Sequence, residues 1–276
     1  MSNVRRRNYP MPATEQDVLQ YANESGFPLQ IAIQHAVEAS ARLTPWQVRY
    51  VEHGWVHPDG LGKGFIDLVL HGPGARQYLV VECKRRLETD WVFMHSSGTS
   101  ADRRHAKIWI TDAIEAAVRR HAWADCHVDP PCPEANFCAV RGQGNRDGDG
   151  MLERIGAELV LATEALASAE RDFRLPSLRY IRAFTPVVVT TARLSVANFD
   201  PATVSLEDGK VPEATITQVP WLRFRKQLAT RFNPLSPADM AGGGDPSYSM
   251  ENTVFVVSAS HFLEFLRGFE LQVPDA

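Results

Sequence analysis

The sequence has few cysteines and no apolar run that approaches the length of a membrane span. Four cysteines among 276 residues do not make the dense framework of a disulfide-stapled secreted domain. The N-terminus carries Arg5, Arg6 and Arg7, but the apolar segment of a signal peptide does not follow them. We therefore expect a soluble, cytoplasmic protein that has no membrane partner.

Neither sign of charge is in large excess. Lysine and arginine number 29 and aspartate and glutamate 33, which gives a formal net charge of −4. A chain without a global basic signature must make any nucleic-acid contact through local patches. At 276 residues it is long enough for one large domain or two small ones with a sizeable core.

Two segments rich in apolar and β-branched residues, 65–71 and 77–84, predict a β-hairpin. Between them Gly72, Pro73 and Gly74 are typical turn residues.

The hairpin register brings charged residues together. If Gly72 pairs with Gln77, paired residue numbers sum to 149, which places Asp67 opposite Glu82. Cβ atoms of directly opposed residues are roughly 5 Å apart. Lys84 points to the same face, two residues beyond Glu82.

Two facing carboxylates within apolar strands repel one another, and buried acids are seldom without a partner. Lys84 offsets one negative charge, and a bound divalent cation would offset the rest. Mg²⁺ suits such a site because it takes few protein carboxylates and keeps positions for water and phosphate oxygens. The alternative is a surface hairpin with an ordinary Glu–Lys pair, but the segment VVECK does not alternate polar and apolar residues.

Asp67, followed by Glu82-Cys83-Lys84 at the end of an apolar strand, resembles the PD-(D/E)xK nuclease superfamily, which has the restriction-endonuclease-like fold. Ile66 stands where the family's name has proline. The resemblance extends over about residues 25–145, with a helix before the hairpin and another after it.

The fold that the resemblance implies is α/β, a mixed central β-sheet flanked by helices. Residues 1–24 would form an N-terminal arm and a short helix, 25–145 the restriction-endonuclease-like core, and 146–276 a C-terminal α+β extension packed on that core.

The implied function is Mg²⁺-dependent hydrolysis of phosphodiester bonds in DNA by an endonuclease, in restriction, phage defence or repair, with Mn²⁺ able to substitute. Asp67 and Glu82 would hold the metal together with the main-chain carbonyl of Cys83. Lys84 would position the attacking water and stabilise charge on the phosphate.

Two other functions stay open. One is a non-catalytic nucleic-acid-binding or assembly module on the same fold. The other is a metal-dependent hydrolase of nucleotides or other phosphate esters. A homodimer is compatible with each of these functions.

Helix signals precede the hairpin. Thr14 and Asp17 form a capping box that predicts a short helix, and a second helix is predicted over 28–42. Nucleases of the resembled superfamily often place a further acid on this second helix, where Glu38 is the candidate. A solvated helix residue is the alternative, and the one we favour. The first strand is predicted over 46–51.

After the hairpin we expect a loop over 88–100, whose Trp91 and Phe93 would cover the site or lie against DNA, and a helix over 102–121. In the resembled fold such a helix packs on the sheet beside the cleft, and a basic solvated face is the equal alternative. The cysteines and histidines within 121–138 lack the usual spacing of a zinc site. The loop 142–150 mimics a calcium loop but lacks its closing glutamate.

The second half alternates helical and β-type segments. We predict helices over 151–173 and 260–268 and strands over 184–191, 194–199 and 253–258. The segment 221–232 interleaves aromatic and basic residues, which favours a nucleic-acid groove but also fits an amphipathic edge element. Residues 233–249 are expected to form a loop.

Overall fold

The computed structural model describes residues 14–72, 74, 76–86, 88–114, 117–141, 150–172, 180–228 and 250–272. The helices are α1 (Glu15–Glu24), α2 (Phe27–Ala39), α3 (Met151–Asp172) and α6 (Phe262–Gly268), with short 3-10 helices η2 (Pro201–Thr203) and η3 (Ala259–His261). The strands are β1 (Gln47–Val56), β2 (Lys63–His71), β3 (Gln77–Lys84), β4 (Asp90–Met94), β5 (Asp102–Ile114), β6 (Ala117–Ala135), β7 (Phe137–Arg141), β8 (Tyr180–Thr190), β9 (Arg193–Asn198), β10 (Thr215–Gln218), β11 (Trp221–Lys226), β12 (Asn252–Ser258) and β13 (Glu270–Gln272).

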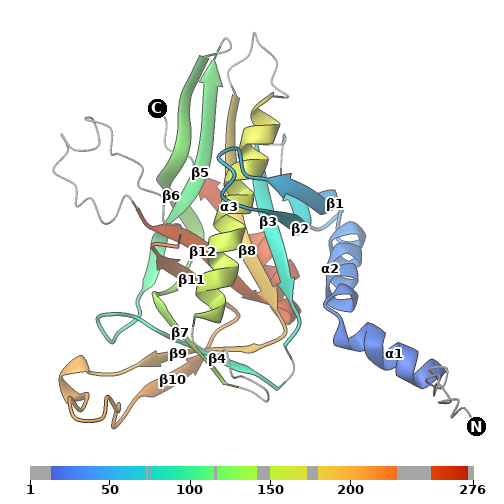
Figure 1. Ribbon diagram of the computed structural model, residues 1–276. Helices are drawn as coiled ribbons and strands as arrows, with labels where there is room; N and C mark the ends of the chain where they lie inside the picture. The colour runs from blue at the N-terminus through green and yellow to red at the C-terminus, as the bar shows by residue number, and fades with distance from the viewer. Residues whose placement is uncertain are drawn as a thin grey trace, which may run out of the picture.

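One mixed sheet dominates the protein, which is of the α/β class (Figure 1). Its strands follow the order β1-β2-β3-β8-β12-β11-β6-β13, and β5 pairs with both β6 and β8. β1, β2 and β3 are antiparallel neighbours, and β8 runs parallel to β3 along the whole of β3. A smaller sheet has the order β10-β9-β4-β7.

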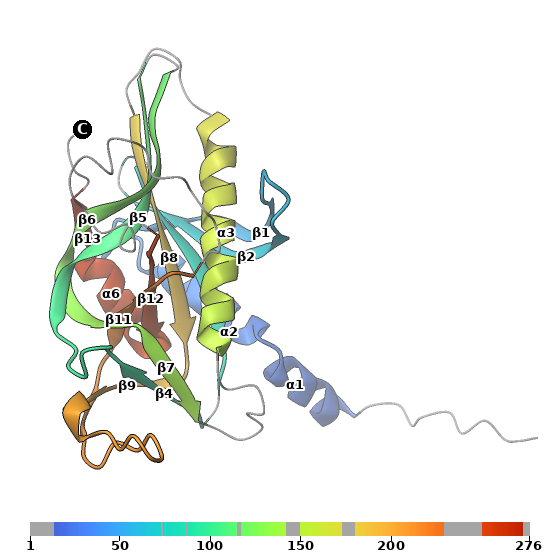
Figure 2. The same ribbon diagram turned by 60° about the vertical axis from the view of Figure 1, so that its left-hand side comes forward.

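Helices cover both faces of the large sheet, with α3 on one face and α6 on the other (Figure 2). The core under α3, here called the α3-side core, includes Tyr78, Val80, Leu159, Leu166 and Phe184. The core under α6 and α2, here called the α6-side core, includes Val37, Leu79, Val81, Phe262 and Phe265. β3 therefore alternates between two buried faces, which explains its near-continuous apolar run.

Several elements expected from the sequence are confirmed. The capping box is present, since the Thr14 hydroxyl accepts from the Asp17 N–H and the Asp17 carboxylate accepts from the Thr14 N–H. The second helix, the hairpin strands and the helix predicted over 151–173 correspond to α2, β2, β3 and α3. The predicted strands of the second half and its closing helix correspond to β8, β9, β12 and α6.

The helix predicted over 102–121 is wrong, because these residues belong to the long antiparallel pair β5–β6. Ala106, Ile108 and Ile110 recur at every second position and pack into the α6-side core. Trp109, between them, packs into the α3-side core. A strand covered on both faces has a near-continuous apolar pattern, which fits a helical period as well as an extended one.

The loop predicted over 88–100 is also corrected, because it contains β4. Trp91 and Phe93, expected to cover the site or to lie against DNA, are fully buried in the α3-side core. They occupy alternate positions of a strand whose neighbours are β7 and β9.

The predicted boundary at residue 145 falls between strands of one sheet. β8, from the range 146–276, pairs with β3, from the range 25–145. The division into a core and an extension stays a prediction. The loops predicted over 142–150 and 233–249 lie mostly outside the described residues. No helix in the described part of the chain is both long and apolar enough to cross a membrane.

A buried carboxylate fixes the end of α3 on the sheet. Glu170, of which 2% of the side chain is exposed, accepts hydrogen bonds from Arg49 Nε (3.1 Å) and Tyr50 Oη (2.8 Å). Arg182 Nη1 of β8 lies 3.5 Å from its other oxygen. Removing one partner of a buried ion pair leaves the other charges uncompensated.

We therefore expect Glu170→Gln to lower the free energy of unfolding by about 2–3 kcal/mol. Urea unfolding followed by circular dichroism measures the change. Asp208→Asn, which breaks an exposed ion pair with Lys210, is the control and should leave the urea midpoint unchanged. Equal midpoints for Glu170→Gln and the wild type would show that this network does not stabilise the fold.

Candidate functional site

The predicted register of the hairpin is confirmed. The Gly72 N–H donates to the Gln77 carbonyl (2.8 Å) and closes the turn. The paired residues then run back to Leu68 opposite Val81.

The ladder between β2 and β3 ends at Leu68–Val81, one position before Asp67 would face Glu82. Hydrogen-bonded pairs alternate along an antiparallel ladder, so the Cys83 N–H would next meet the Ile66 carbonyl. It donates instead to Asp67 Oδ2, at 2.6 Å. The Asp67 carboxylate thus lies against the main chain of β3 beside Glu82, and the two residues are not a ladder pair as expected.

Lys84 forms an ion pair with the other acid of the motif. Its Nζ lies 2.5 Å from Glu82 Oε1, and both side chains are partly exposed. This is the neutralisation of one negative charge that the sequence predicts for Lys84.

Sequence reasoning missed a third carboxylate at this place. Glu52 of β1 lies between the paired positions Val51–Leu68 and His53–Ile66, at the register of Asp67. Its backbone has a φ of 49°, which is uncommon for a residue other than glycine. The predicted first strand ended at residue 51, so no sequence signal placed Glu52 beside β2.

A helix side chain links this acid to the motif strand. The buried Gln30 of α2 donates from Nε2 to Glu52 Oε1 (2.6 Å) and to the Asp67 carbonyl (3.1 Å). Glu38, the acid expected from α2, is exposed, and its carboxylate accepts a hydrogen bond from Gln34 (2.9 Å). The residue of α2 that contacts the motif is therefore Gln30.

These surroundings make Asp67 a titrating group near neutral pH. Burial, together with the neighbouring Glu82 carboxylate, raises the pKa of Asp67 from 3.8 to about 6. The Cys83 N–H and the Lys84 ammonium act in the opposite direction, and Glu52 adds to the increase. A carboxyl group with such a pKa among charged neighbours is a candidate functional group.

Cys83 could contribute only its main chain. Its side chain is buried in the α6-side core, and burial raises the pKa of the thiol far above its ordinary value. The role predicted for Cys83 uses its carbonyl oxygen, which does not depend on thiol chemistry.

The end of β3 is fixed by its parallel neighbour. Thr190 Oγ1 of β8 donates to the Lys84 carbonyl (2.9 Å), and the Arg86 N–H donates to Thr191 Oγ1 (2.7 Å). The motif therefore lies on strands held by the sheet, which suits a site that needs defined geometry.

A cavity of about 310 Å³ opens beside the motif. Glu82 forms part of its wall, together with residues at the start of β2 and in the N-terminal half of α3. Its other lining residues are Trp55, Leu61, Gly62, Lys63, Gly64, Phe65, Ile155, Glu158, Leu159, Leu161 and Ala162.

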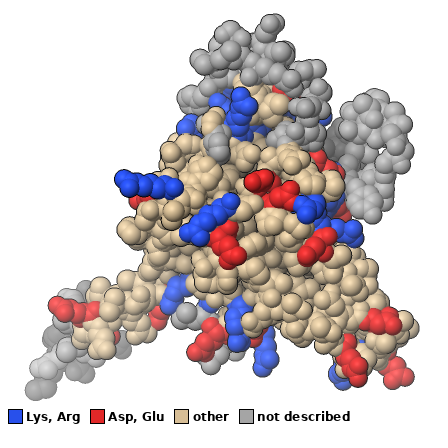
Figure 3. Space-filling view, turned by 180° about the vertical axis from the view of Figure 1, so that it is seen from behind, with Lys and Arg blue, Asp and Glu red and all other residues tan. Residues whose placement is uncertain are grey.

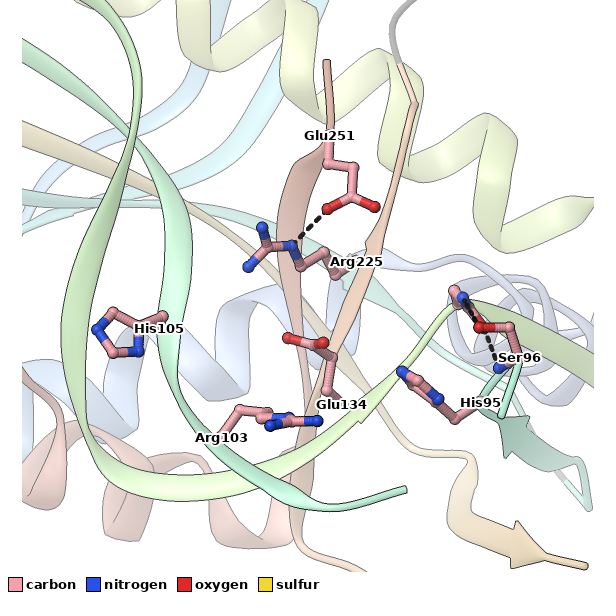
Figure 4. Close-up of a pocket in the computed structure, with 8 residues that line it drawn as sticks. His95, Ser96, Arg103, His105, Glu134, Arg225 and Glu251 are labelled. Atoms are coloured by element: carbon pink, nitrogen blue, oxygen red, sulfur yellow. Dashed lines mark hydrogen bonds and ion pairs between the residues drawn. The ribbon is translucent and has the colours of Figure 1, made fainter. Parts of the chain in front are cut away.

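A second cavity, of about 470 Å³, carries charges of both signs (Figure 4). Arg103, Glu134 and the Arg225–Glu251 ion pair (2.7 Å) lie around it, with His105 on the adjoining strand β5. None of the predicted site residues lines this cavity.

The basic residues of the segment 221–232 that the structure describes serve the fold. Arg223 is buried and donates to the carbonyls of His105 (2.6 Å) and Cys132 (3.1 Å). Arg225 pairs with Glu251, and Lys226 with Glu153. The described part of the segment forms β11, which lies inside the sheet between β12 and β6, and these contacts do not favour a nucleic-acid groove. On the face opposite the one seen in Figure 1, acidic and basic side chains are interspersed (Figure 3).

The motif offers few protein ligands to a magnesium ion. Among the described residues, no three His, Cys, Asp or Glu side chains are grouped closely enough to hold a metal. Among the described residues none donates a hydrogen bond to Asp67 Oδ1, whereas Oδ2 accepts one from the Cys83 N–H. Mg²⁺ commonly uses one or two carboxylates and keeps several waters, so Asp67 and Glu82 fit it if Lys84 releases Glu82.

Comparisons of the chain with protein-family models, with curated proteins and with solved structures found no match.

The pKa of Asp67 predicts how stability depends on pH in metal-free buffer. Between pH 4 and 6 the native state binds more protons than the unfolded state, so the free energy of unfolding falls as pH rises. We expect Asp67→Asn to unfold like the wild type at pH 4 and to be about 2 kcal/mol more stable at pH 7.5. Urea titrations at both pH values measure this difference.

Asp102→Asn, at an exposed position, is the matched control and should behave alike at both pH values. A difference between Asp67→Asn and the wild type that does not change with pH would contradict the raised pKa.

Proposed function

We propose that the protein is a Mg²⁺-dependent nuclease that hydrolyses phosphodiester bonds in DNA, with a restriction-endonuclease-like core of the PD-(D/E)xK type. The observation that carries the proposal is the contact between the Asp67 carboxylate and the Cys83 N–H (2.6 Å). It brings the isolated aspartate and the E-x-K residues together across two buried strands. α2 before the hairpin agrees with the arrangement that the resemblance implies, whereas the helix expected over 102–121 is replaced by β5 and β6, and the next helix is α3.

The charge balance supports a bound cation. The carboxylates of Glu52 and Glu82 raise the pKa of Asp67, and the Lys84 ammonium lowers it. Asp67 and Glu82 are partly buried, whereas Glu52 is exposed, and partly buried carboxylates are costly without compensating positive charge. A divalent cation would supply it and would lower the pKa of Asp67.

Each motif residue then has a role. Asp67 and Glu82 would hold Mg²⁺ with the Cys83 carbonyl, and the ion would supply polarisation of the phosphate and a more acidic water. Lys84 would move from Glu82 to the attacking water and stabilise charge that builds on the phosphate. Gln30 would keep Glu52 beside Asp67 without itself contacting the ion.

Plasmid cleavage tests the proposal. With Mg²⁺ or Mn²⁺ we expect nicking or linearisation of supercoiled plasmid, and none with EDTA. Asp67→Ala, Glu82→Ala and Lys84→Ala should each lose at least about 100-fold in rate. Gel electrophoresis over a time course measures the rate.

Lys210→Ala, at an exposed position outside the site, should cleave like the wild type. Full activity in any one of the three motif variants, purified and folded, would refute the assigned roles.

Metal binding gives a second readout that needs no substrate. At a Mg²⁺ concentration 100 times its Kd, the wild type should gain about 2.7 kcal/mol in unfolding free energy. Because protons compete for Asp67, affinity should be about tenfold weaker at pH 5 than at pH 7. Isothermal titration calorimetry measures the affinity, and Asp67→Asn should bind at least tenfold more weakly at pH 7. Equal affinity at the two pH values would exclude Asp67 as a ligand.

One observation favours a non-catalytic binding or assembly module instead. The Lys84–Glu82 ion pair (2.5 Å) occupies an acid that metal binding requires. Bound DNA without metal-dependent cleavage or Mg²⁺ affinity would support this second function.

A further inference from the structure

The cavity beside Glu82 has the size and lining of a site for one planar group. At about 310 Å³ it lies at the low end of the roughly 300–1,000 Å³ of small-molecule pockets. Its lining is mixed: Trp55 of β1, Phe65 of β2 and Leu159 and Ala162 of α3 supply apolar surface, and Lys63, Glu82 and Glu158 supply charge.

Phe65 is an aromatic side chain left exposed next to the motif. Two thirds of it (66%) is accessible, although it lies on the strand that carries Asp67 two residues later. It stands over Gly54 of β1, where a Cβ would lie 3.6 Å from the ring. Its ring therefore has support on the protein side and an accessible surface on the cavity side.

The loop that borders the cavity is held in one position. Gly62 and Gly64 lie on the Trp55 indole, where added Cβ atoms would meet the ring at 3.1 and 3.3 Å. At the start of the loop, the buried His57 accepts the Asp59 N–H on Nδ1 (3.2 Å). Its Nε2 therefore carries the ring proton, and it donates a hydrogen bond to a residue of α3 that fixes the loop.

That residue is Glu164 of α3, 3.1 Å from His57 Nε2. Glu164 also accepts from Trp123 Nε1 at 2.8 Å. The loop is thus joined to α3 through buried hydrogen bonds, so the cavity wall is preformed and little ordering is needed on binding.

The charges at the cavity are of both signs, since Glu82 and Glu158 line it together with Lys63, so a phosphate could approach only the ammonium groups. The exposed Lys63 lines the cavity and forms no ion pair with a described residue. Lys84 lies against Glu82 in the wall. A nucleotide would place its apolar base against Phe65 and its phosphate near these ammonium groups.

We propose that this cavity binds one unstacked base of a single-stranded nucleic acid, with the adjoining phosphate directed to Glu82 and Lys84. The inference rests on the proposed nuclease function and adds that the enzyme recognises the strand at an unpaired base. Exposed aromatic rings bind bases of single strands by stacking. In a duplex the base faces are covered, and extrusion requires loss of pairing and stacking.

Binding without cleavage tests the inference. Fluorescence anisotropy in EDTA compares a labelled 12-nucleotide single strand, its duplex and a single strand of the same length with abasic sites at every position. We expect the wild type to bind the single strand at least tenfold more tightly than either other probe. Comparable affinities for the single strand and the duplex, or for the single strand and the abasic strand, would overturn the proposal.

Variants locate the contact. Phe65→Ala should weaken single-strand binding about tenfold, whereas Phe65→Tyr keeps the ring and should retain it. The control is Phe137→Ala, which removes another exposed phenylalanine (49% accessible) on β7 and should change nothing. Equal binding by Phe65→Ala and the wild type would overturn the proposal, and the abasic probe decides it even if Phe65→Ala does not fold.

The two proposals can fail separately. Phe65-dependent single-strand binding without cleavage in Mg²⁺ would support the base site and refute the nuclease. Metal-dependent cleavage of duplex that Phe65→Ala leaves unchanged, with no preference for single strands, would support the nuclease and refute the base site.

Discussion

The candidate site depends on one hydrogen bond that replaces part of a β-ladder. A regular hairpin would pair the Cys83 N–H with the main chain of β2, but the Asp67 carboxylate accepts it instead. The exchange costs little in hydrogen bonding, since the buried donor stays paired. Its consequence is electrostatic, because it holds a carboxylate in a half-buried place beside Glu82. A main-chain hydrogen bond from Cys83 to β2 would have served the fold equally well. The Asp67 carboxylate, with its raised pKa, is therefore the candidate functional group.

The sheet can hold this arrangement because both of its faces are covered. The α3-side and α6-side cores fix β3 between them, and β8 pairs along its full length. Two acids of α3, Glu164 and Glu170, fix that helix to the loop before β2 and to β1. The cavity wall and the motif strands are therefore parts of one packed unit, and a charged site can be kept without collapse of the strands around it.

The sequence allowed the hairpin to be predicted because local rules determine it. The turn residues set the register and period-two burial set the faces, so Asp67, Glu82 and Lys84 could be brought together without a structure. The helix predicted over 102–121 was wrong because Ile108 and Trp109 are both buried. An apolar run covered on two faces has no unique period. Gln30 and Glu52 could not be found, because their contact depends on how α2 packs on β1 and on a left-handed residue within a strand. Register shifts and helix docking are tertiary effects that no local pattern encodes.

The same residues relate the charge of the site to its shape. Glu82 belongs both to the group of carboxylates around Asp67 and to the wall of the cavity. A phosphate that enters from the cavity would attract Lys84 and weaken its ion pair with Glu82, which makes that carboxylate available to a cation. Binding of the phosphate would then strengthen binding of the metal, and the reverse. Each would bind one partner of the Lys84–Glu82 pair and so compensate a charge that opening of the pair leaves unpaired. In this arrangement the Lys84–Glu82 pair is the resting state of the site, and its opening is the step that binding must drive.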